Sequence, residues 1–132
     1  MLQSKALRCS AMATGKEHNM NSKAYKSYEI SKNEYRELKY FCLRYGEMSQ
    51  TIEKNEKNTE KYWNALTSVM IIHDALNSAA ENETIRAYLR RSVTENVRFD
   101  RLDVPMGRRQ FYELRRKFFY ILCGLKMGYE VQ

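Results

Sequence analysis

The segment from Arg108 to Lys117 concentrates side chains that bind phosphates and base edges. It reads Arg-Arg-Gln-Phe-Tyr-Glu-Leu-Arg-Arg-Lys, so four arginines and one lysine fall within ten residues. An arginine guanidinium binds a phosphate or a guanine edge through two parallel hydrogen bonds, and a glutamine amide binds adenine in the same manner. The chemistry that this segment predicts is therefore recognition of a nucleic acid.

The positive charge of the chain lies in the same region. The 132 residues carry a formal net charge of +7. Residues 86–126 hold nine arginines and two lysines against four acids, which accounts for the whole excess and leaves the remainder neutral. A concentration of arginine favours nucleic-acid binding, with a merely solvated basic face as the alternative.

Apolar residues recur at helical spacing among these polar groups. Phe111, Leu114 and Phe118 are separated by three and four residues, which predicts one inward face of a helix over 108–126. Before it we expect a helix capped by Asn82 and a short helical turn over 99–102. The turn 103–107 follows, in which Pro105 interrupts the backbone ladder and Gly107 supplies tight geometry and the cap of the last helix.

This order of elements is typical of a helix-turn-helix, whose second helix enters the major groove of DNA. Residues at the beginning of its outer face reach base edges, and later ones hold phosphates. We assign the base-reading positions to Arg108, Arg109, Gln110 and Tyr112. We assign the phosphate contacts to Arg98, Arg101, Arg115, Arg116 and Lys117.

Two alternatives stay open within this segment. Glu113 either accepts from a cytosine amino group or pairs with Arg109 or Lys117, four residues away on the helix. The helix as a whole could instead be a basic amphipathic helix that only packs on a partner or a membrane surface. The preceding short helix and turn disfavour that interpretation, because an isolated surface helix does not need them.

The earlier part of the chain predicts two helices. Ser31 and Glu34 form a capping-box pattern, with Ile30 and Tyr35 in the positions of a hydrophobic staple, and we expect this helix to end at Gly46. Residues 50–61 predict either a loop or the solvated beginning of the next helix. An apolar stripe over 62–80 then predicts a long helix, antiparallel to the first.

Several single residues and the N-terminal segment complete this prediction. His73 lies in the apolar stripe, so we expect a buried histidine without a metal. Residues 1–28 predict a flexible basic tail, and Met20 is an alternative start of the protein. The predicted fold is all-α, with a tail over 1–28, a helical pair over 29–81 and a helix-turn-helix unit over 82–127.

No pattern indicates catalysis, a metal or a cofactor. The chain has no HExxH, P-loop or GxGxxG motif, and its cysteines, Cys9, Cys42 and Cys123, lie far apart. We therefore expect free thiols in a reducing cytoplasm and a protein that is not an enzyme. No apolar run reaches the length of a membrane span, and no signal peptide is indicated.

The segment from Phe99 to Phe119 resembles the C-terminal motif of the ArpU and RinA group of late-transcription regulators. These are small phage and prophage proteins of low-GC Gram-positive bacteria. The shared pattern is a proline, two residues, an arginine, two residues, Phe-Tyr, two residues and Arg-Arg-Lys-Phe, which begins here at Pro105. The segments around Ile30–Lys32 and Tyr40–Cys42 also look like the beginning of such proteins.

The resemblance implies a helix-turn-helix similar to region 4 of sigma factors, bound to double-stranded DNA in a bacterial cytoplasm. It carries over onto Arg108, Phe111, Tyr112, Arg115 and Arg116. Because one such unit makes few base contacts, we expect a homodimer or RNA polymerase as a partner of the neutral N-terminal part. The alternative function is a protein adaptor, or a small phage structural or packaging subunit, whose basic helix binds an acidic partner.

Overall fold

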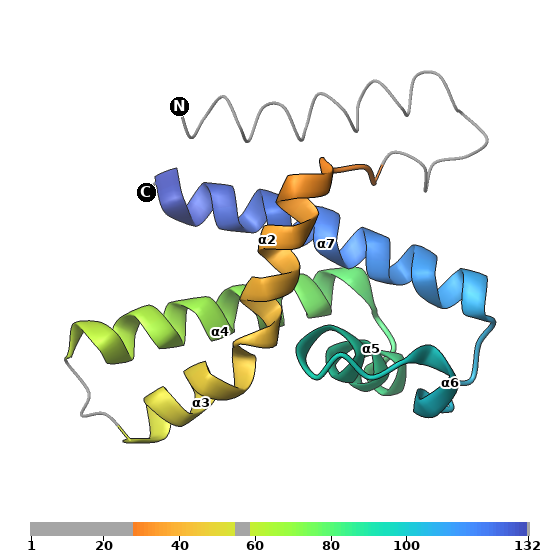
Figure 1. The fold of residues 1–132 in the computed structure, drawn as a ribbon, viewed down its shortest axis with the longest axis horizontal. Helices are drawn as coiled ribbons and strands as arrows, with labels where there is room; N and C mark the ends of the chain where they lie inside the picture. The colour runs from red at the N-terminus through yellow and green to blue at the C-terminus, as the bar shows by residue number, and fades with distance from the viewer. Residues whose placement is uncertain (1–27, 55–58, 132) are drawn as a thin grey trace.

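The computed structural model describes residues 28–54 and 59–131, and throughout these ranges the chain is helical without a strand (Figure 1). The prediction of an all-α fold is confirmed. The helices are α2 (Lys32–Leu43), α3 (Tyr45–Lys54), α4 (Glu60–Ala79), α5 (Glu83–Thr94), α6 (Phe99–Leu102) and α7 (Arg108–Val131). Residues 1–27 of the predicted tail, which include Cys9 and Met20, lie outside the described residues. Residues 55–58 also lie outside them.

Helix beginnings follow the capping residues. The Ser31 hydroxyl accepts from the backbone N–H of Glu34 at 3.1 Å, and the Ser31 N–H donates to the Glu34 carboxylate at 3.2 Å, so the capping box is confirmed. Asn82 caps α5 as predicted, because its side-chain oxygen accepts from the N–H of Ile85 at 3.0 Å. Thr59 caps α4 in the same way through Tyr62 at 3.2 Å.

The N-terminal half contains a helix that the sequence pattern did not predict. The first helix ends at Leu43, and α3 begins at Tyr45 and continues through Gly46, so Gly46 is not a helix stop. Residues 50–54 belong to α3, which packs along α4 and runs antiparallel to it (Figure 1). The antiparallel neighbour of α4 is therefore α3, because α2 packs against α5 and α7 instead.

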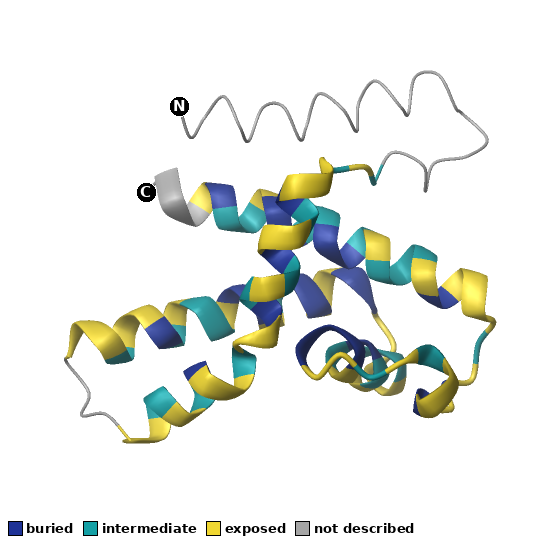
Figure 2. Ribbon diagram, viewed as in Figure 1, coloured by how far each residue is buried: buried dark blue, intermediate teal, exposed yellow. Residues whose placement is uncertain are grey.

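The core is continuous across all parts of the described chain. Buried residues of every helix form one hydrophobic cluster, in which α4 lies along α7 and α2 crosses both (Figure 2). The largest fully buried side chains are Phe111, Phe118, Phe119, Ile72, Leu76, Leu89 and Leu122. The predicted helical pair and the predicted helix-turn-helix unit thus share one core.

His73 is exposed, so the prediction of a buried histidine is wrong. On α4 the inward positions are Ile72, Leu76 and Ala79, and His73 lies about 100° around the helix from Ile72. Its Nε2 atom lies 2.7 Å from the hydroxyl of Tyr45, which links α4 to the beginning of α3.

The geometry of the turns also differs from the prediction. Positive φ angles occur at Asn96 (57°) and Asp103 (59°), on either side of α6, and not at Gly107. The carbonyl of Gly107 accepts from the N–H of Phe111 at 2.9 Å, so Gly107 does occupy the predicted position at the beginning of α7. Helix α7 also continues past its predicted end at Lys126, through Gly128, to Val131.

Candidate nucleic-acid interface

The short helix α6 holds the first turns of α7 through aromatic contacts. The ring of Phe99 lies 5.6 Å from that of Phe111 and 6.3 Å from that of Tyr112, measured between centroids. The Arg108 guanidinium lies over the same Phe99 ring, 5.2 Å from its centroid. Leu102 of α6 is buried in the core, so these contacts fix the direction in which α7 leaves the turn.

The first three turns of α7 present an exposed polar face opposite the core. Phe111 and Phe118 are buried, whereas Arg109, Tyr112 and Arg116 are exposed. The intervals of three and four residues place these three side chains on one face of the helix. We call Arg109, Tyr112 and Arg116 the outer face of α7.

Two of the four predicted base-reading residues lie beside the outer face rather than on it. Arg108 is exposed but is held over Phe99 of α6. Gln110 is exposed on the other flank, where it lines a shallow hollow with Met106, Glu113 and Lys117. The structure therefore brings Arg109 and Tyr112 together and sets Arg108 and Gln110 on either side of them.

Arg115 is half-buried and joins three helices. Its guanidinium donates to the hydroxyl of Tyr35 on α2 at 3.0 Å and to the hydroxyl of Ser92 on α5 at 3.1 Å. It also lies 5.2 Å from the centre of the Phe119 ring. Arg115 thus has internal partners and lies off the outer face, although it lines one cavity together with Tyr112 and Arg116.

Glu113 pairs with a residue that the sequence pattern did not select. Its carboxylate accepts from Arg116 at 2.8 Å, three residues along the helix, rather than from Arg109 or Lys117. The second carboxylate oxygen, Oε2, is buried without a hydrogen-bond partner among the described residues. Half of the Arg116 side chain stays exposed beside this pair.

The remaining predicted phosphate contacts are spread over two helices. Arg98 and Arg101 are exposed at α6, and Arg98 lies 3.8 Å from the carboxylate of Asp100. Lys117 is half-buried in the hollow that Gln110 lines. The positive charge therefore surrounds the beginning of α7 instead of forming one row.

The thiol of Cys42, on α2, has no role at this surface. Burial raises the pKa of Cys42 to about 12, and the nearby positive charge of Arg115 opposes that shift only in part. The thiol therefore stays protonated at neutral pH and is a poor nucleophile. Within 28–54 and 59–131, no cluster of histidine, cysteine and acidic residues could hold a metal ion, and no helix could cross a membrane.

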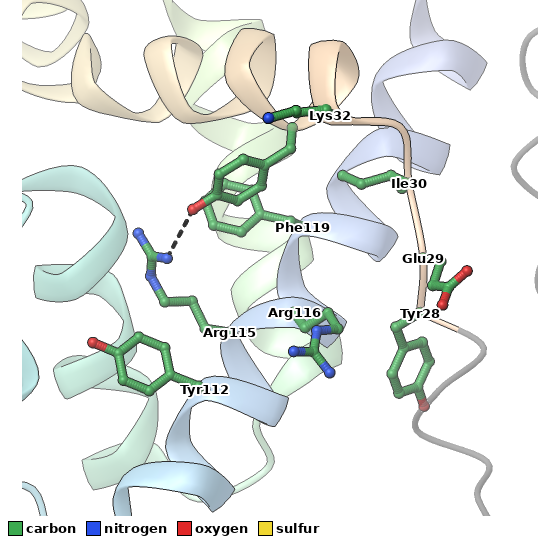
Figure 3. Close-up of a pocket in the computed structure, with 9 residues that line it drawn as sticks. Tyr28, Glu29, Ile30, Lys32, Tyr112, Arg115, Arg116 and Phe119 are labelled. Atoms are coloured by element: carbon green, nitrogen blue, oxygen red, sulfur yellow. Dashed lines mark hydrogen bonds between the residues drawn. The ribbon is translucent and has the colours of Figure 1, made fainter.

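The beginning of α2 borders the outer face, which the sequence pattern did not indicate. Tyr28, Glu29, Ile30 and Lys32 line a cavity whose opposite wall includes Tyr112, Arg115, Arg116 and Phe119 of α7 (Figure 3). The ring of Tyr28 lies 5.5 Å from that of Tyr120. The two segments are over 80 residues apart in the chain, so spacing within either one could not reveal their contact.

A comparison of the chain with protein-family models, curated proteins and solved structures found no match.

Proposed function

We propose that this chain is a sequence-specific double-stranded DNA-binding protein that regulates transcription, with the first three turns of α7 in the major groove. The observation that supports the proposal is the outer face of α7. It projects Arg109, Tyr112 and Arg116 away from a core that buries Phe111 and Phe118. An exposed helix face held behind a short helix and a turn is what entry into a groove requires.

The distribution of charge supports the same proposal. Four arginines lie on or beside the beginning of α7 and at α6, namely Arg98, Arg101, Arg108 and Arg109, and all are exposed. In this arrangement Arg109 and Tyr112 reach base edges, with Arg108 and Gln110 at their sides. Arg98, Arg101, Arg116 and Lys117 hold the phosphates on either side of the groove.

The resemblance to phage and prophage late-transcription regulators extends the proposal to the cellular setting. The protein would act in the cytoplasm of a bacterial host, as a product of a phage or prophage. One reading helix contacts few base pairs, so a homodimer or RNA polymerase would supply the remaining specificity. The protein would act without a cofactor and without catalysis.

Titration with duplex DNA over a series of salt concentrations tests the proposal. Binding should weaken steeply as salt rises, because each neutralised phosphate releases counterions. Absence of duplex binding even at low salt would rule the proposal out.

Two substitutions test the assignment of residues. We expect Arg109→Ala to relax the preference among sequences selected from a random pool, because it removes a base contact. We expect Lys117→Ala to weaken binding to all sequences equally, because it removes a phosphate contact. If both variants select the same sequences as the unsubstituted protein, Arg109 does not read bases.

The second candidate is a non-enzymatic adaptor, or a small phage structural or packaging subunit. The observation in its favour is that the outer face combines arginine with an exposed tyrosine, two residue types that are enriched at protein interfaces. An acidic protein surface would then replace the DNA. Binding to an acidic protein without any binding to duplex DNA would favour this candidate.

A further inference from the structure

The cavity between the beginning of α2 and the outer face of α7 has the composition of a binding site. Its volume is about 440 Å³, and it opens beside Tyr112 and Arg116. Figure 3 shows the segment from Tyr28 to Lys32 passing along one side of the cavity and α7 along the other. A ligand in this cavity would therefore touch both α2 and the helix that we propose to lie in the major groove.

The lining separates into an apolar floor and a charged rim. Tyr35 and Phe119 pack edge to face, with ring centroids 5.1 Å apart, and Ile30 lies beside them. Lys32 and Arg116 lie at opposite edges of this floor (Figure 3). Arg115 also lines the cavity, with its guanidinium held by Tyr35 and Ser92. An apolar floor between two cations matches the sugar and the phosphate of a nucleic-acid backbone.

The acidic residues near the cavity leave its cationic rim available. The Glu29 carboxylate is directed outward, away from Phe119 (Figure 3). Glu113 engages one terminal nitrogen of Arg116 at 2.8 Å, and a guanidinium has five N–H donors in total. Arg116 can therefore bind a phosphate while it keeps its ion pair.

We propose that this cavity receives one sugar-phosphate unit of the DNA backbone that flanks the major groove. Lys32 and Arg116 bind the phosphate from two sides, and the deoxyribose packs on the exposed part of the Tyr35 ring, which Phe119 supports from below. This inference rests on the proposed function and adds α2 to the DNA-contacting surface. The contact supplies affinity without sequence preference, because it touches no base.

Lys32→Ala tests the inference, with Lys61→Ala as the matched control. Both lysines are exposed in the first turn of a helix, but Lys61 belongs to α4 and does not line the cavity. Each variant is titrated over a salt series with a mixed-sequence duplex of about three helical turns. Lys32→Ala should weaken binding about three- to tenfold at low salt. It should also lower the slope of log K against log salt by about 0.9.

Further outcomes separate this inference from the proposed function. Lys32→Arg should restore the affinity and the slope, and sequence preference should stay unchanged in both Lys32 variants. If Lys32→Ala behaves like Lys61→Ala while the unsubstituted protein binds the duplex, the cavity does not hold a phosphate and the proposed function stands. If the unsubstituted protein does not bind the duplex, both proposals are overturned.

Discussion

One face of α7 is exposed in the first half of the helix and buried in the second half. Tyr112 and Arg116 in the first half are exposed, whereas Phe119, Cys123 and Met127 in the second half are buried. Intervals of three and four residues place all five on one face. The face changes from exposed to buried because α2 packs over it in the second half, where Tyr35 contacts Phe119 and Lys126 lies over Phe41 (Figures 1 and 2). The extent of the exposed outer face is therefore set by the position of α2.

Substitutions at equivalent positions of the two halves should give the largest difference. We expect Phe119→Ala to lower the free energy of unfolding by about 3–5 kcal/mol, because it leaves a cavity in the core beneath α2. Tyr112→Ala should change it by less than about 1 kcal/mol, because that ring is partly exposed. Chemical denaturation followed by circular dichroism measures both values.

For sequence preference in duplex binding, the substitution of Tyr112 should have the larger effect and that of Phe119 the smaller. Under conditions in which both variants are folded, Tyr112→Ala should alter sequence preference and Phe119→Ala should retain it. Equal losses of stability in the two variants would contradict the division of α7 into an exposed and a covered half.

Two adjacent arginines, Arg115 and Arg116, allow the same comparison with a smaller expected change in the free energy of unfolding. Arg115→Met should lower the free energy of unfolding by about 1–3 kcal/mol, because it removes hydrogen bonds to Tyr35 and the buried Ser92. Arg116→Met should lower it by less than about 1 kcal/mol, because its ion pair with Glu113 is half exposed. Thermal unfolding of the two variants under the same buffer conditions makes the comparison.

Their effects on duplex binding should be unequal in the other direction. Arg116→Met should weaken binding and lower its salt dependence, whereas folded Arg115→Met should do so less, because Arg115 lines the same cavity but its guanidinium is held by Tyr35 and Ser92. An equal loss of affinity in the two variants, without a loss of stability in Arg115→Met, would mean that Arg115 leaves its internal partners and contacts DNA.

Glu113→Gln, in the first half of α7, should have the smallest effect on stability and on duplex binding. The change removes a negative charge beside Arg116 and replaces a carboxylate whose second oxygen is buried without a partner among the described residues. We expect the free energy of unfolding to change by less than about 1 kcal/mol. Duplex binding should become slightly tighter for all sequences alike, as measured by titration. A changed sequence preference would instead show that Glu113 reads a base.

The features that the sequence predicted well depend on neighbours within one or two helical turns. The caps at Ser31 and Asn82, the short helix α6 and the inward register of Phe111 and Phe118 are of this kind. Each depends on residues fewer than eight positions apart in the sequence, so the local pattern contains the information needed to predict it.

The features that could not be predicted depend on contacts between distant segments. Helix α3 has one buried residue, Met48, and its packing along α4 determines its position. Arg115 has the same residue type as Arg116, and only the positions of Tyr35 and Ser92 show that it faces inward. The cavity at Lys32 likewise exists only because α2 crosses α7. The sequence pattern therefore predicted α7 and its inward register but not the boundary of the exposed surface around it.

The left-handed residues beside α6 have a consequence for how this protein can vary in evolution. Asn96 and Asp103 hold positive φ angles, which glycine, asparagine and aspartate adopt at lower energy than other residues do. Gly107 has no such angle, and a methyl group added there would meet nothing within 4 Å. Among descendants of a common ancestor, positions 96 and 103 should therefore exchange only among these three residues. Position 107, although it is a glycine here, should also accept the other residues that favour the beginning of a helix, namely serine, threonine, asparagine and aspartate.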